Sequence, residues 1–236
     1  KKRGYIFLKI QFDQLEYQDK AIDAVVSLFE GQQIKQSNFT VVDKDNQGKL
    51  WTDYGVGNKV DISERKLLDN LQEVQISNDI VRSDSPTTSS PQFNIEMETG
   101  TGKTFVYIKT MLELNKNYGF SKFIIVVPSL AIKEGVMKTF EMTEEYFRRE
   151  YHGVIYRPFI YDSKKLDTVR SFAVDNTIQI MIINIQAFIK DVKADEERSS
   201  KASNLIYRES EDLSGMVPID LISATKPIVI IDEPQS

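Results

Sequence analysis

Apolar residues in the second half of the chain occur in short continuous runs, separated by longer segments with helical spacing. The runs cover residues 122–127 (KFIIVV), 178–183 (IQIMII) and 227–232 (PIVIID). Such a run, rich in Ile and Val, is typical of a strand that is buried on both faces. Because these strands alternate with helices, the pattern predicts an α/β fold, a mainly parallel sheet with helices on both faces.

The same patterns predict the remaining elements. Helices are expected at residues 16–30, 64–74, 103–116, 131–150, 165–172 and 217–224. Further strands are expected at residues 5–10, 93–97 and 154–161. Ser63 is expected to cap the second helix, and Gly31 to end the first. The polar segments 31–62, 83–92 and 191–203 are predicted to be irregular or loops.

Residues 97–104 (METGTGKT) lie between a predicted strand and a predicted helix, which is the setting of a phosphate-binding loop. Its glycines would let backbone amides point inward, and the N-terminus of the helix favours an anion. Lys103 would reach the β- and γ-phosphates, and the Thr104 hydroxyl would ligate Mg²⁺. Met97 stands where the motif usually begins with glycine. The residues assigned to nucleotide binding are Thr99, Gly100, Thr101, Gly102, Lys103 and Thr104.

The apolar run at 228–231 ends in two adjacent carboxylates, Asp232 and Glu233. Asp232 would hold Mg²⁺, and Glu233 would orient and deprotonate the attacking water. Because successive side chains on a strand point to opposite faces, the two carboxylates can take different roles. The alternative, an ordinary acidic turn, is disfavoured by the phosphate-binding motif upstream. Lys103 and Glu233 are therefore the catalytic candidates, and Thr104 and Asp232 the metal candidates.

Three segments together resemble one known family. FNIEMETGTGKT, KFIIVVPSLAIKEGV and PIVIIDEPQS are similar to the Res subunit of type III restriction enzymes, which are superfamily 2 helicase-like ATPases. Met at the first loop position is common in that family, and DEPQ is fairly specific to it. The resemblance implies that residues 1–236 form the first RecA-like P-loop NTPase lobe of a longer protein. It is weakest over residues 31–91, where an irregular insertion is expected.

The resemblance also implies roles for residues outside the two main motifs. Gln18 in LEYQDKAI would read the adenine of ATP, with Tyr17 packed nearby, although a surface glutamine on an amphipathic helix would look the same. Pro128 and Ser129 resemble a motif that touches the DNA backbone, and a simple strand-to-helix turn is the alternative. Asn184 and Gln186 resemble a further DNA-contacting segment. These candidate contacts are Pro128, Ser129, Asn184 and Gln186.

Charge and composition limit the classes of partner. The net charge is −5, from 30 basic and 35 acidic residues. Dedicated nucleic-acid-binding domains are usually basic, so DNA contacts are expected from local groups. The absence of cysteine excludes disulfides, zinc-thiolate sites and thiol nucleophiles. No apolar stretch approaches the roughly 20 residues that span a bilayer, so no membrane partner is expected and a cytoplasmic location is predicted.

Two further motifs are interpreted as coincidental. Ser223-Ala224-Thr225 spells the helicase coupling motif but precedes the acidic motif, whereas the family places it afterwards. Asn58-Lys59-Val60-Asp61 matches the guanine-reading motif of GTPases. A GTPase switch motif would, however, need glycine at Gln235, so a GTPase is disfavoured.

The resemblance implies an ATP- and Mg²⁺-dependent DNA translocase or helicase-like lobe that couples ATP hydrolysis to DNA cleavage in a type III restriction endonuclease. Its expected partners are double-stranded DNA and a Mod-type DNA methyltransferase subunit, which supplies sequence recognition. The family's second lobe and nuclease domain do not lie in these residues, so this chain alone is expected to hydrolyse ATP poorly. Two alternatives stay open. One is another superfamily 2 motor lobe, from a repair helicase or type I restriction subunit, and the other is a non-hydrolysing nucleotide-binding docking module.

Overall fold

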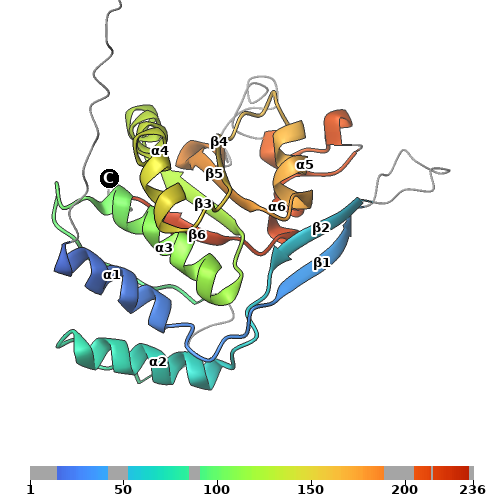
Figure 1. The fold of residues 1–236 in the computed structure, drawn as a ribbon. Coiled ribbons are helices and arrows are strands. Elements are labelled where there is room, and N and C mark those ends of the chain that lie inside the picture. Colours follow the sequence, from blue (N-terminus) through green and yellow to red (C-terminus); the bar gives the residue numbers. More distant parts are fainter. Residues whose placement is uncertain (1–14, 42–52, 85–90, 189–204, 214, 234–236) are drawn as a thin grey trace, which may run out of the picture.

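The computed structural model describes residues 15–41, 53–84, 91–188, 205–213 and 215–233. Its centre is a parallel four-stranded sheet with strand order β4-β5-β3-β6 (Figure 1). The predicted α/β fold with a parallel sheet is confirmed. The strands of this sheet are β3 (Lys122–Val127), β4 (Tyr156–Ile160), β5 (Ile178–Asn184) and β6 (Ile228–Ile231).

Helices cover both faces of the sheet, as the continuous apolar strands predict. In β3, Phe123 and Ile125 belong to a core shared with α1–α4, whereas Ile124 belongs to a second core shared with α5 and α6. The helices are α1 (Glu16–Ser27), α2 (Glu64–Ser77), α3 (Lys103–Tyr118), α4 (Leu130–Glu150), α5 (Asp167–Val174) and α6 (Pro218–Ala224). Short 3-10 turns occur at Ile185–Phe188, Leu205–Tyr207 and Glu211–Leu213.

The expected helix ends are largely confirmed. Ser63 caps α2 by accepting a hydrogen bond from the Lys66 amide at 3.2 Å. The first helix ends at Ser27, and a turn leads to Gly31, whose φ of 94° lies in the left-handed region. The predicted strand at 5–10 lies outside the described residues, as do 85–90 and the whole of the loop predicted at 191–203.

A hairpin occupies part of the segment that was predicted to be irregular, so that prediction was wrong there. β1 (Gln36–Val41) and β2 (Asp53–Asn58) form an antiparallel pair. Glycines within β2 permit close packing against neighbouring groups. A Cβ at Gly55 would lie 2.2 Å from the Phe39 ring, and one at Gly57 would lie 2.8 Å from the Thr225 carbonyl oxygen.

The strand predicted at residues 93–97 is also wrong, because this segment is irregular. Its Ile95 side chain is 51% exposed. A strand needs a hydrogen-bonded neighbour, and β6 pairs only with β3 among the described residues. The phosphate-binding motif therefore follows an irregular, unpaired segment and not a strand.

The two coincidental motifs have a structural role, and they contact each other. Asn58 is buried, and its side chain accepts hydrogen bonds from the Ser121 amide at 2.8 Å and the Lys122 amide at 3.1 Å. Its amide group also donates to the Lys122 carbonyl at 2.8 Å. The backbone amide of Asn58 donates to the Thr225 carbonyl at 2.8 Å. Because these groups are engaged, Asn58 does not present its side chain to a guanine base.

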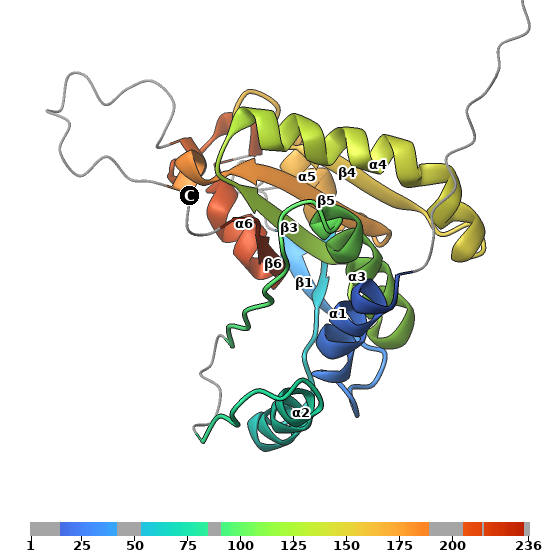
Figure 2. The same cartoon turned by 90° about the vertical axis from the view of Figure 1, so that its left-hand side faces the viewer.

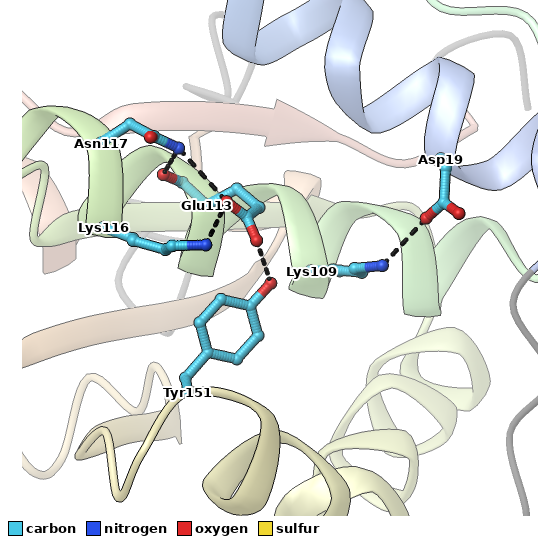
Figure 3. A network of polar contacts seen from close by, with 6 residues as sticks. All are labelled: Asp19, Lys109, Glu113, Lys116, Asn117 and Tyr151. Atoms are coloured by element: carbon cyan, nitrogen blue, oxygen red, sulfur yellow. Dashed lines mark hydrogen bonds and ion pairs between the residues drawn. The ribbon is translucent and has the colours of Figure 1, made fainter.

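Polar contacts fix the helix that follows the phosphate-binding motif (Figure 3). Lys109 of α3 forms an ion pair with Asp19 of α1, at 2.9 Å between Nζ and Oδ1. Near the other end of α3, the Tyr151 hydroxyl donates to Glu113 at 2.8 Å. The helix is thus held from α1 and from the end of α4. Within the described residues, no helix is long and apolar enough to cross a membrane.

Candidate functional site

The candidate residues gather at one edge of the sheet. Because β3, β5 and β6 are parallel, their carboxyl ends meet at the same edge. α3 begins at Lys103 beside this edge, where its Nζ lies 3.6 Å from Glu233 Oε1 beyond β6. Figure 2 shows the loop before α3 passing alongside β6.

The loop has the backbone shape that a phosphate cradle requires. Gly100 and Gly102 have φ angles of 81° and 83°, in the left-handed region that favours glycine. A Cβ at Gly100 would meet nothing within 4 Å, so the loop is open to solvent there. Thr101 steadies the turn by donating from Oγ1 to the Glu98 carbonyl at 2.6 Å.

The N-terminus of α3 suits an anion. Gly102 occupies the N-cap position, and no side chain caps the helix. The amides of the first helical turn carry no intrahelical partner, and the helix dipole adds partial positive charge at this end. The Lys103 side chain is partly exposed, at 32%, as is that of Glu233, at 42%. An entering phosphate could therefore compete with Glu233 for the ammonium.

The two carboxylates leave the sheet in different ways. The Asp232 amide donates to the Val126 carbonyl at 2.9 Å and so extends the contact with β3. Glu233 has φ 51°, which is uncommon for a residue with a side chain. β6 ends at Ile231, so this turn, and not strand alternation as expected, sets the direction of Glu233.

Electrostatics distinguish Asp232 from its neighbours. Burial raises the pKa of the Asp232 carboxyl, and the charge of Glu233 raises it further, against opposing effects of Lys103 and Tyr107. Burial destabilises the charged form of a carboxyl group, and a nearby cation stabilises that form. Asp232 therefore suits a place beside Mg²⁺.

Sequence reasoning missed Tyr107. Its hydroxyl is buried and lies close to the Thr104 and Asp232 side chains, without a well-formed hydrogen bond to either. Burial raises its pKa, so the hydroxyl keeps its proton. The sequence does offer one signal for this residue. Tyr107 follows Thr104 by three positions and Lys103 by four, and side chains at these spacings share one face of a helix.

Tyr17 and Gln18 of α1 contact the loop directly. Gln18 Nε2 donates to the Thr101 carbonyl at 2.8 Å, and the Tyr17 hydroxyl donates to the same oxygen at 3.2 Å. A Cβ at Gly102 would lie 2.7 Å from Gln18 Nε2, so glycine there makes room for this contact. The structure brings both residues to the loop, and their role toward adenine stays a prediction.

The four DNA-contact candidates end two neighbouring strands. Ser129 follows β3 and caps α4, with Oγ accepting from the Ile132 amide at 3.3 Å. Asn184 ends β5 and accepts from the Gln186 amide at 2.8 Å, and Gln186 itself is exposed. The strand-to-helix turn considered for Pro128 and Ser129 is present, and DNA contact stays a prediction.

The donor set fits magnesium that arrives with a nucleotide. Among the described residues, no group of three or more His, Asp or Glu side chains could hold a metal ion. Mg²⁺ is commonly bound by one or two carboxylates together with phosphate oxygens and water. Asp232 and the Thr104 hydroxyl can supply the protein part of such a site.

The fold and these motifs define a RecA-like lobe of the helicase-like class. A family model described as "Type III restriction enzyme, res subunit" matches residues 11–234. The chain belongs to this family.

Curated relatives agree with this assignment. The chain is 33% identical over 189 residues to the EcoP15I Res subunit of Escherichia coli, covering 73% of this chain and 19% of the relative. It is 29% identical over 241 residues to the EcoPI Res subunit of Escherichia phage P1, covering 98% of this chain and 23% of the relative. The chain thus spans less than a quarter of the length of these relatives.

Proposed function

We propose that the chain is the first ATP- and Mg²⁺-dependent motor lobe of a type III restriction endonuclease, with a structural insertion at about residues 31–91. The supporting observation is the approach of Lys103 to Glu233, at 3.6 Å, across the open end of the sheet. It joins the phosphate-binding motif to the acidic motif in space. The similar proteins are Res subunits of type III restriction-modification enzymes, which favours this assignment over a repair helicase or a type I subunit.

Each residue at the site has a chemical task in this proposal. The glycine loop and the first turn of α3 bind the phosphates, and Lys103 neutralises the terminal ones. Thr104 and Asp232 would hold Mg²⁺, which would neutralise phosphate charge. Glu233 orients the attacking water and accepts its proton. Gln18 contacts the adenine edge when it turns away from Thr101.

The proposed partners follow from the family. Double-stranded DNA would cross the sheet edge at Pro128, Ser129, Asn184 and Gln186. Hydroxyl, amide and backbone groups can contact phosphates without a positive field, which suits a net charge of −5. A Mod-type methyltransferase subunit would supply sequence recognition, and ATP hydrolysis would be coupled to DNA cleavage.

Nucleotide binding tests the phosphate assignment. Replacing Lys103 by Ala in the complete enzyme removes a charged partner of the phosphates, so ATP affinity should fall by about 10- to 100-fold, the loss expected for a hydrogen bond to a charged group. Titration with a fluorescent ATP analogue measures this change. Lys116→Ala, which removes an exposed lysine from the same helix, is the matched control. Unchanged affinity in Lys103→Ala would contradict the proposed function.

A further inference from the structure

Tyr107 lies on the face of α3 that carries the phosphate-binding residues. It follows Lys103 by four positions and Thr104 by three, so the three side chains share one side of the helix. Its ring packs against the core that also receives Ile228 and Ile230 of β6. Tyr107 of α3 and the strand that leads to Asp232 therefore border the same core.

The hydroxyl of Tyr107 is placed at a cost. Its oxygen is buried and makes no well-formed hydrogen bond, although Thr104 and Asp232 lie close to it. A buried polar group without a partner destabilises a fold, and phenylalanine would fill the same space without that penalty. Core packing alone therefore explains the ring and leaves the hydroxyl unexplained.

The neighbours of the hydroxyl indicate its use. Thr104 and Asp232, the two candidate ligands of Mg²⁺, are the side chains that act on it. A tyrosine hydroxyl carries its proton at neutral pH, so it can donate a hydrogen bond to a carboxylate. The Asp232 backbone is fixed by its bond to Val126, which leaves the rotation of the carboxylate to be set by side-chain contacts.

We propose that Tyr107 is a positioning residue whose hydroxyl donates a hydrogen bond to the Asp232 carboxylate in the nucleotide-bound site. The bond holds the carboxylate on the side of Thr104, so that both ligands face the same ion. This inference rests on the proposed function, because it assigns Asp232 and Thr104 to Mg²⁺. It adds a residue that acts through Asp232 and does not itself touch the metal.

The variant Tyr107→Phe tests the hydroxyl while it keeps the ring. In the complete enzyme, ATP affinity measured in EDTA should stay within about twofold of wild type. The Mg²⁺ concentration that half-saturates nucleotide binding should rise about tenfold or more, as for other residues that orient metal ligands. The melting temperature without nucleotide should be unchanged or higher, because an unpaired buried hydroxyl is removed.

Two controls separate this role from packing. Tyr156→Phe removes another buried hydroxyl that makes no well-formed hydrogen bond. Tyr156 lies on β4, the strand farthest from β6 in the sheet, so this variant should leave the Mg²⁺ dependence unchanged. In an Asp232→Asn background, Tyr107→Phe should cause no further loss, because the two residues act together. An unchanged Mg²⁺ dependence in Tyr107→Phe, or losses that add independently, would overturn the inference. Unchanged ATP binding in Lys103→Ala would instead overturn the proposed function.

Discussion

Lys122 places an ammonium group inside the protein, at the start of β3. The residue is fully buried, and its Nζ donates to the carbonyls of Phe172, at 2.7 Å, and Asp175. Burial lowers the pKa of Lys122 to about 8 from 10.5, although the charge of Asp175 partly opposes this. These carbonyls lie in and just after α5, so the side chain ties α5 to the sheet.

The lowered pKa of Lys122 predicts a pH-dependent stability. Between the folded pKa of about 8 and the unfolded value of 10.5, the unfolded chain binds more protons, so stability gains as pH rises. The free energy of unfolding of wild type, relative to Lys122→Met, should therefore increase by roughly 2 to 3 kcal/mol between pH 7 and pH 10. Urea titration at both pH values measures it.

The control for this prediction is Lys138→Met, which removes an exposed lysine from α4. At each pH, the free energy of unfolding of the variant is subtracted from that of wild type. The contributions of the tyrosines and other groups that titrate in the same range cancel in this difference, because both proteins contain them. A difference between wild type and Lys122→Met that does not change with pH would show that the lysine is not held as a buried cation.

At the residue scale, the role of a side chain can be predicted from the sequence where a short motif with fixed spacing defines it. Lys103, Thr104 and the acidic pair follow from motifs, and the structure brings Lys103 and Glu233 together. Tyr107 and Lys122 could not be assigned, because their environments depend on how α3 packs near β6 and α5 near β3. A tyrosine in an amphipathic helix and a lysine before an apolar run look like ordinary surface residues.

At the scale of elements, the β1–β2 hairpin is joined to the main sheet through Asn58. Its side chain satisfies the amides of Ser121 and Lys122 and the carbonyl of Lys122, and its amide reaches Thr225. The hairpin thus connects the beginning of β3 with the end of α6. All of these contacts lie at the amino end of β3, away from the candidate site at its carboxyl end.

Replacing Asn58 by Ala should destabilise the fold without changing the site. The free energy of unfolding should fall by about 3 kcal/mol, because buried backbone groups lose their partners. ATP affinity of the folded variant should stay near wild type. Urea unfolding and nucleotide titration measure the two effects, with Asn38→Ala, an exposed residue of β1, as the control. A stability equal to wild type would refute the structural role of Asn58.

The elements were predictable where a local pattern determines them. β3 matches its apolar run, and α3 and α4 match their helical spacing, with ends displaced by no more than two residues. The hairpin was not predicted because the glycines of β2 resemble turn signals in the sequence. Only the structure shows that they make room for Phe39 and Thr225. The segment 93–97 has the composition of a strand, but a strand also depends on a neighbour that no local pattern reveals.

At the scale of the whole molecule, the proposed function assigns to this chain one side of a reaction site. The sheet edge collects the phosphate loop, the acidic pair and the candidate DNA contacts on one surface. In the proposed motor, a second lobe would supply the arginine that stabilises transition-state charge, an effect worth about 10³- to 10⁵-fold in related phosphoryl transfer. The isolated chain should therefore be a poor ATPase, and catalysis is best measured in the complete enzyme.

The most direct test of the motor assignment is ATP turnover by the complete enzyme carrying Glu233→Gln. The amide keeps the size of the side chain but cannot accept the proton of water, so DNA-stimulated turnover should fall at least about a hundredfold. ATP affinity should stay within about threefold of wild type. Glu145→Gln, at an exposed site on α4, is the control and should hydrolyse ATP normally. Normal turnover by Glu233→Gln would contradict the account.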